Sequence, residues 1–195
     1  MAVLAGTVAG VFRSKVQGQS YHIADLRYLG LVLIAYTPQM FVFQLPATRN
    51  KFSVELAAAV LVCSQILLLF FTWFNRDQPG FWLLSLGLAL NFLVIVLNGG
   101  LMPISPETID RLIPKAPPGT WAVGERFGTG KDFVIIASET RLWWLSDRFL
   151  LPAWFPARAA YSIGDMVIAV GAFIFFWSSG RRKSKISNVN LVQEG

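Results

Sequence analysis

Long apolar stretches separated by short polar connections set the pattern of this chain. Four stretches are long and apolar enough to cross a bilayer core of roughly 30 Å, at a helical rise of about 1.5 Å per residue. They are approximately Leu26–Leu45, Val54–Phe74, Phe81–Leu97 and Ile163–Trp177. The pattern therefore predicts four membrane-spanning helices.

A shorter apolar stretch at the N-terminus, MAVLAGTVAGVF, predicts a fifth, short helix. No charge precedes it, whereas Arg13 and Lys15 follow it, which reverses the charge order of a signal peptide. Small residues recur at Ala2, Gly6 and Gly10, a spacing that lets a neighbouring helix approach the backbone closely. We expect this first helix to pack against protein.

The long segment 99–160, between the fourth and fifth helices, holds seven of the ten prolines. So many prolines argue against long helices within it. The segment also contains FVIIA (Phe133–Ala137) and RLWWLSDRFLLPAWFP (Arg141–Pro156), which are too apolar for a solvated linker. We expect an ordered but irregular loop within an all-α, five-helix transmembrane domain over residues 1–180.

Positive charges in the connections predict the orientation, because cytoplasmic loops of membrane proteins are enriched in lysine and arginine. Two positive residues, Arg49 and Lys51, fall on one side of the predicted helices and eight on the other. The eight are Arg13, Lys15, Arg27, Arg76, Arg181, Arg182, Lys183 and Lys185. The C-terminus and a basic tail, 181–195, are then cytoplasmic, and the N-terminus and the long loop lie outside the plasma (inner) membrane.

Composition favours the same class of protein. The chain is 54% hydrophobic and 14% charged, with a mean hydropathy of +0.53, which is more apolar than a water-soluble domain. The net charge of +6 depends on the RRKSK run after the last apolar stretch, and such a run is typical of a membrane-edge anchor. We expect membrane lipids and other integral membrane subunits as partners, and no nucleic acid. The single cysteine, Cys63, excludes an intrachain disulfide.

Polar residues mark the ends and one face of the predicted helices. Asn98 and the glycines after it can end a helix, whereas Ser162-x-x-Asp165 is a variant capping box that begins one. Asn91 lies seven residues before Asn98, on the same helix face. Two interpretations of these asparagines stay open, which are hydrogen bonding between helices and a ligand or ion path.

Three motifs carry a resemblance to a known family. LNGGLMPISPE, LWWLSD and YSIGDMVIAVGAFIFF, in this order, resemble a bacterial family of small polytopic membrane proteins that is catalogued as a domain of unknown function. The resemblance runs from the first helix to about Gly180, although Ser146 stands where the family pattern has glycine. It implies a shared feature and no particular activity. The feature comprises Asn98, Gly99, Gly100, Met102, Pro103, Asp147, Ser162, Gly164 and Asp165.

Catalytic chemistry has few candidates in this sequence. The only histidine, His22, falls on the cytoplasmic side, which excludes a serine–histidine pair with the loop serines. A haem with two histidine ligands is disfavoured because the chain has no second histidine, whereas a haem or pigment with His22 as its single axial ligand stays open. Asp147 and Asp165 could approach each other to hold a divalent cation or transfer a proton. Alternatively they cap helices or pair with Arg141, Arg148 or Arg158. The pattern indicates no catalytic residue or metal ligand set and leaves any cofactor unknown.

Two functional hypotheses follow. The first is a non-catalytic accessory or scaffolding subunit of a larger bacterial membrane complex, with energy-transducing (respiratory or photosynthetic) complexes as one option. The second is a membrane enzyme or lipid-handling protein that uses an outer-face site at Asp147 and Asp165.

Overall fold

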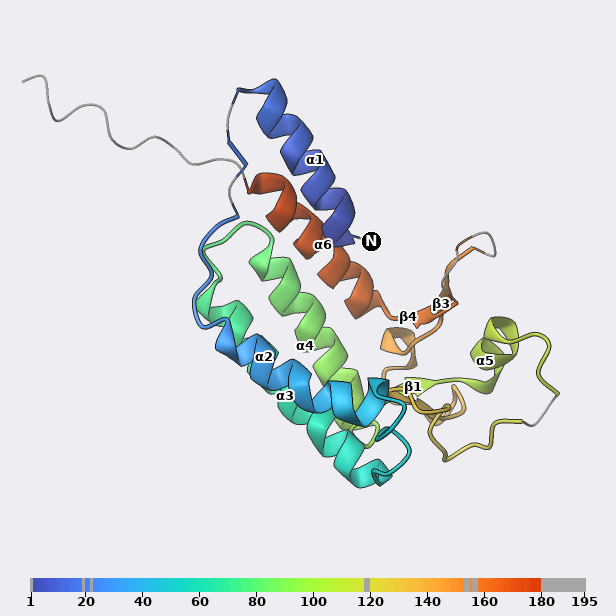
Figure 1. The fold of residues 1–195 in the computed structure, drawn as a ribbon. Helices are drawn as coiled ribbons and strands as arrows, with labels where there is room; N and C mark the ends of the chain where they lie inside the picture. Colours follow the sequence, from blue (N-terminus) through green and yellow to red (C-terminus); the bar gives the residue numbers. More distant parts are fainter. Residues whose placement is uncertain are drawn as a thin grey trace, which may run out of the picture.

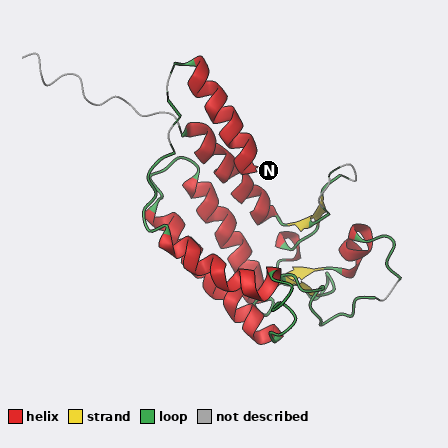
Figure 2. Ribbon diagram, viewed as in Figure 1, coloured by secondary structure: helices red, strands yellow, loops and turns green. Residues whose placement is uncertain are grey.

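The computed structural model describes residues 2–18, 20–21, 23–117, 120–152, 155 and 158–179. The described part is mostly helical, as predicted (Figure 2). Its α-helices are α1 (Ala2–Val16), α2 (Gly30–Gln39), α3 (Val54–Phe74), α4 (Phe81–Leu97), α5 (Pro106–Leu112) and α6 (Ile163–Ser178). His22 and the basic tail 181–195 lie outside the described residues.

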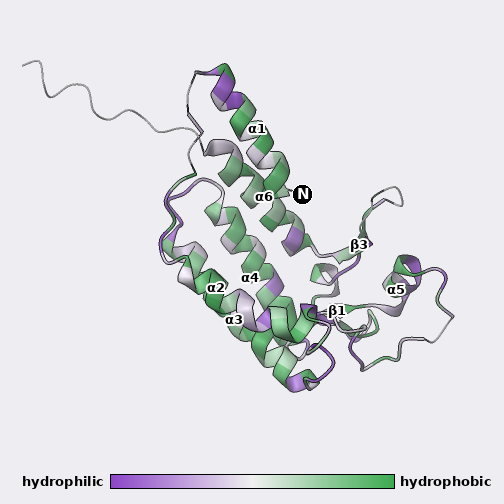
Figure 3. Cartoon of the chain, in the orientation of Figure 1, coloured by the Kyte–Doolittle hydropathy of each residue, from purple (hydrophilic) through white to green (hydrophobic). Residues whose placement is uncertain are grey.

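The five long helices lie side by side in a single row. α1 packs against α6, α6 against α4, α4 against α3, and α3 against α2, as Figure 1 shows. Leu31 and Val32 of α2 pack against a buried cluster of Phe71, Phe81 and Phe175 from α3, α4 and α6, so α2 covers part of the row. Hydrophobic residues extend along all of these helices (Figure 3). The exposed fractions reach 68% for Leu33, 62% for Trp82, 54% for Phe70 and 52% for Val170.

One helix in the described part is long and apolar enough to cross a membrane, the 21-residue α3. The apolar helices Gly30–Gln44, Phe81–Leu97 and Ile163–Ser178 are shorter than that. The predicted stretch Leu26–Leu45 begins its helix only at Gly30, after a turn. Its last turn is a π-helix, η1 (Met40–Gln44), just after Pro38, which cannot donate a backbone hydrogen bond.

Glycines bring α4 and α6 close together. A Cβ atom on Gly87 would lie 2.6 Å from the carbonyl oxygen of Gly164, and one on Gly171 would lie 2.8 Å from the carbonyl oxygen of Gly80. These separations are far below ordinary contact distances, so only glycine fits. Glycines also bring α1 close to α6, because Gly6 lies against the backbone of Phe173 and Gly10 against that of Phe176. The residue numbers rise together, so α1 and α6 run parallel.

The segment between α4 and α6 folds into a cap at one end of the helix row (Figure 1). It contains β1 (Met102–Ile104), β2 (Asp132–Val134), the 3-10 turn η2 (Trp143–Leu145), β3 (Phe149–Leu150) and β4 (Ala160–Tyr161), besides α5. β1 pairs in parallel with β2, and β3 pairs antiparallel with β4. The mostly helical fold is confirmed, whereas the two small sheets within the cap were not predicted. Segments such as Met102–Ile104 and Asp132–Val134 pair because their backbone groups need hydrogen-bond partners.

Candidate functional site

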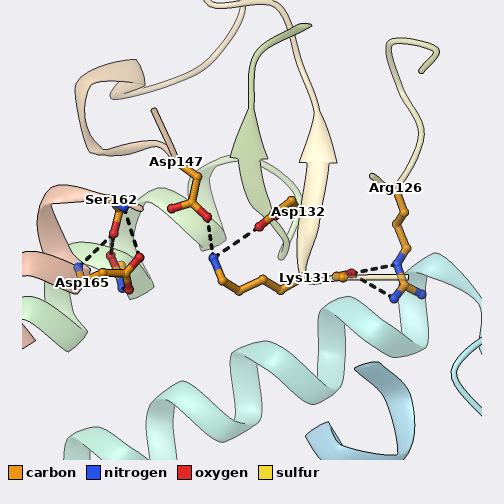
Figure 4. A network of polar contacts seen from close by, with 8 residues as sticks. Arg126, Lys131, Asp132, Asp147, Ser162 and Asp165 are labelled. Atoms are coloured by element: carbon orange, nitrogen blue, oxygen red, sulfur yellow. Dashed lines mark hydrogen bonds and ion pairs between the residues drawn. The ribbon is translucent and has the colours of Figure 1, made fainter. Parts of the chain in front are cut away.

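A buried ion pair occupies the centre of the cap. The Lys131 Nζ lies 2.6 Å from Oδ2 of Asp147 and 3.2 Å from Oδ1 of Asp132 (Figure 4). The side chain of Asp147 is 1% exposed, whereas that of Lys131 is 41% exposed. The Lys131 side chain is therefore partly exposed, whereas its ammonium group lies against two carboxylates.

Strand β1 holds both partners of this pair. The backbone N–H of Met102 donates to the carbonyl of Lys131 at 3.0 Å, and the N–H of Asp147 donates to the carbonyl of Pro103 at 3.1 Å. The NGGLMP turn thus leads into β1. Met102 of β1 bonds the backbone of Lys131, and Pro103 of β1 bonds the backbone of Asp147. This explains how residues far apart in sequence meet.

Asn98 fixes where the cap joins α4. Its side-chain amide donates to the carbonyl of Arg141 at 2.9 Å and accepts from the Arg141 N–H at 2.9 Å. Gly100 has a φ of +90°, and a Cβ there would lie 2.8 Å from the Cβ of Ala58. The turn needs glycine for both its backbone conformation and its close approach to α3.

A second polar network connects α4 with the start of α6. The N–H of Asp165 donates to Ser162 Oγ at 3.0 Å, and the N–H of Ser162 donates to Asp165 Oδ2 at 3.1 Å, which completes a capping box. Asn91 adds the link to α4, because its Nδ2 donates to Asp165 Oδ1 at 2.9 Å and its Oδ1 accepts from Ser162 Oγ at 2.9 Å. Gly164 leaves the space that the Asn91 side chain occupies.

The electrostatics of the cap follow from one lysine among three carboxylates. Burial raises the pKa of Asp147 to about 8, with Asp132 and Asp165 acting in the same direction and Lys131 against it. Burial lowers the pKa of Lys131, but the same three carboxylates outweigh it and raise that pKa overall. Oδ1 of Asp147 has no hydrogen-bond partner among the described residues. The arrangement provides a fixed cation beside a buried group that can hold a proton.

Asp147 and Asp165 belong to adjoining networks and have different partners. Asp165 caps α6, whereas Asp147 pairs with Lys131 and not with Arg141, Arg148 or Arg158, so the arginine alternative was wrong for it. The guanidinium of Arg148 instead lies 4.2 Å from the centre of the Trp143 ring. Within the described residues, no three histidine, cysteine, aspartate or glutamate side chains are grouped to hold a metal.

Sequence reasoning missed Lys131 as the partner of Asp147. The available signal was a lysine at the end of FGTGK, directly before the apolar DFVIIA segment. A charge that is buried at the start of a strand is costly unless an opposite charge pairs with it. Spacing alone could not identify that charge, because Asp147 lies sixteen residues further along the chain.

One of the comparisons with known proteins identifies a family. Residues 23–177 match a family of unknown function, DUF5317. A Thermotoga maritima protein described as uncharacterized is 28% identical over 178 residues, covering 90% of each chain. No solved structure matches the chain. The family match begins after α1, whereas the resemblance was expected to include the first helix, and it contains both polar networks of the cap. The chain therefore belongs to the family of unknown function DUF5317.

Proposed function

We propose that the chain is a multi-pass protein of the plasma (inner) membrane, with α1, α2 together with η1, α3, α4 and α6 embedded in lipid. The exposed surface of the helix row supports this placement, because it carries large apolar side chains such as Leu33, Trp82 and Val170. In water these side chains would be unfavourable, whereas lipid tails cover them without cost. The cap then lies on the outer side and the α3–α4 connection on the cytoplasmic side.

Within the membrane, the protein acts as a non-catalytic accessory or scaffolding subunit of a larger complex. The exposed apolar side chains of the helix row carry this proposal, since they offer apolar surface to neighbouring helices. Asn91, Ser162 and Asp165 support it as well, because they are engaged with one another and hold α4 to α6. An energy-transducing complex, respiratory or photosynthetic, is one candidate for this larger complex.

The orphaned oxygen of Asp147 favours a second candidate function, an outer-face site for a lipid headgroup. Oδ1 of this buried carboxylate has no hydrogen-bond partner among the described residues. The neighbouring Lys131 side chain is partly exposed, so the headgroup would approach the pair along this side chain. In this alternative, Lys131 and Asp147 bind the headgroup and Asp165 positions the start of α6.

Purification of the tagged protein from its native membrane in a mild detergent tests the accessory function. We expect integral membrane proteins in a fixed molar ratio, identified by mass spectrometry, and an absorption spectrum reports any bound pigment. Recovery of the chain alone, with lipid as its only companion, would contradict the accessory function and favour the outer-face site.

Two matched variants separate the two candidate functions. Asp165→Asn weakens the capping box. If the protein is an accessory subunit, the amount of the protein and the amount of assembled complex should fall in the same proportion. Lys131→Gln leaves the capping box of Ser162 and Asp165 intact but removes the cation beside Asp147. If Lys131→Gln assembles normally and loses a bound lipid that the wild type retains, the outer-face site is supported and the accessory proposal fails.

A further inference from the structure

An apolar groove lies between α3 and α4 on a face of the helix row. Its volume is about 620 Å³. The side chains that line it include Ile66, Phe70 and Trp73 of α3 and Trp82, Leu86 and Ala89 of α4. Several of them are widely exposed, with values of 62% for Trp82 and 54% for Phe70. The groove is therefore an open apolar channel along the helices.

Two tryptophans mark the end of the groove at the α3–α4 connection. The rings of Trp73 and Trp82 contact edge to face, with 6.4 Å between their centroids. Tryptophan is enriched where lipid headgroups meet the hydrocarbon core. This end of the groove therefore corresponds to the headgroup level of the bilayer, and the end at Ile66 to its interior.

A cation lies beside the tryptophan end. The guanidinium carbon of Arg76 is 4.6 Å from the centre of the Trp73 ring, and no ion pair involves Arg76 in the described part of the chain. Asn75 holds a second arginine nearby, because its side chain bonds the backbone N–H and carbonyl of Arg27. Arg27 is paired with Asp77 at 3.7 Å. Arg76 donates a long hydrogen bond of 3.5 Å to the carbonyl of Trp73 but has no carboxylate partner among the described residues, so its charge is left for an external anion.

The dimensions of the groove fit hydrocarbon chains. From Ile66 to Trp73 it runs along about 10 Å of helix, at a rise of about 1.5 Å per residue. Its apolar lining along both helices suits an acyl chain that lies between α3 and α4.

We propose that this groove binds an anionic phospholipid of the inner leaflet, with an acyl chain between α3 and α4 and the phosphate against Arg76. The proposal rests on the membrane placement and orientation proposed above and goes beyond the accessory function. Charge complementarity selects the ligand, because an unpaired arginine at the mouth of an apolar groove matches an anion attached to a hydrocarbon chain.

Tryptophan fluorescence tests the proposal directly. The purified full-length protein in detergent is titrated with phosphatidylglycerol or phosphatidylcholine that carries bromine atoms on its acyl chains, which quench nearby indoles such as Trp73 and Trp82. We expect half-maximal quenching at a roughly fivefold lower mole fraction of phosphatidylglycerol, the effect of about one cation at an anionic surface. Equal quenching by the two lipids would overturn the groove proposal alone. Quenching by neither lipid would overturn the membrane placement as well.

Matched variants locate the site. Arg76→Gln should abolish the preference for phosphatidylglycerol. Lys51→Gln makes the same change of charge at an exposed position before α3, at the opposite end of that helix, and should retain the preference. Ala89→Phe fills the groove and should reduce quenching by both lipids, whereas Leu33→Phe on exposed α2 should not. Arg76→Gln with an unchanged preference would overturn the proposal.

A second copy of the chain is the competing occupant. Ser85→Cys, in a chain with Cys63→Ala, places one thiol in the groove. If oxidation in native membranes joins two chains through this thiol, a second copy covers the groove and the lipid proposal fails. If the thiol stays monomeric and addition of phosphatidylglycerol slows its alkylation, the proposal is supported.

Discussion

Asp147 is a buried carboxylate whose two oxygens have unequal surroundings. Oδ2 accepts from Lys131 at 2.6 Å, whereas Oδ1 has no partner among the described residues. A charged carboxylate with an unsatisfied oxygen is costly to bury. The raised pKa of Asp147 expresses this cost, and it makes the cap sensitive to pH.

The free energy of unfolding should decrease as the pH rises from about 4 to about 8. With a pKa raised from 3.8 to about 8, the folded chain holds a proton on Asp147 where the unfolded chain does not, so the free energy of unfolding decreases between about pH 4 and pH 8. Asp147→Asn removes this titration. We expect the wild-type melting temperature to drop by several degrees more than that of the variant between pH 5 and pH 8, because about 1 kcal/mol corresponds to about 2–4 °C at this chain size. Identical slopes would contradict the raised pKa.

Gly164→Ala tests the contact between α4 and α6 at a single residue. Its Cβ would collide with the Asn91 side chain and lie 2.8 Å from the carbonyl oxygen of Gly87. Such overpacking costs about 1–3 kcal/mol, measured by thermal unfolding in detergent. Gly30→Ala is the control, because a Cβ at Gly30 meets nothing within 4 Å. Equal stabilities of the two variants would show that the helices can move apart freely.

At the level of elements, Asn98 attaches the cap to the end of α4. Asn98→Ala removes two hydrogen bonds to the backbone of Arg141 and one to the carbonyl of Val94. We expect a loss of about 1–3 kcal/mol, because the backbone groups of Arg141 lose their partners. Limited trypsin digestion should cut the segment between Arg111 and Lys131 faster. Asn50→Ala, at an exposed turn, serves as the control and should digest like the wild type.

The sequence predicted some elements closely and others poorly, for physical reasons. The bounds of α3 and α4 agree with the predicted stretches, because continuous apolar runs end there at polar or glycine residues such as Ser53, Asn75 and Gly80. The capping box at Ser162 was also readable from local spacing. The strands of the cap were missed because segments of two or three residues carry no periodicity. The Lys131–Asp147 pair depends on β1, which contacts both segments, and no local pattern contains that information.

For the whole molecule, orientation is the property with the clearest test. Single cysteines replace Lys51, Asp77 or Thr120 in a chain with Cys63→Ala. If the cap faces outward, a membrane-impermeant thiol reagent added to intact cells labels positions 51 and 120, and it labels position 77 only after the membrane is opened. Labelling of position 120 from the cytoplasmic side alone would reverse the proposed orientation.

The order of helices in the row differs from their order in the chain. α2, α3 and α4 contact their sequence neighbours, whereas α1 packs on α6, and Tyr21 donates a hydrogen bond to the Phe176 carbonyl across 155 positions. Because synthesis proceeds from the N-terminus, α1 is made first and meets its partner last. A nascent chain halted before Ile163 would display the bare glycine face of α1, a surface by which an assembly factor or a protease can recognise an unfinished protein.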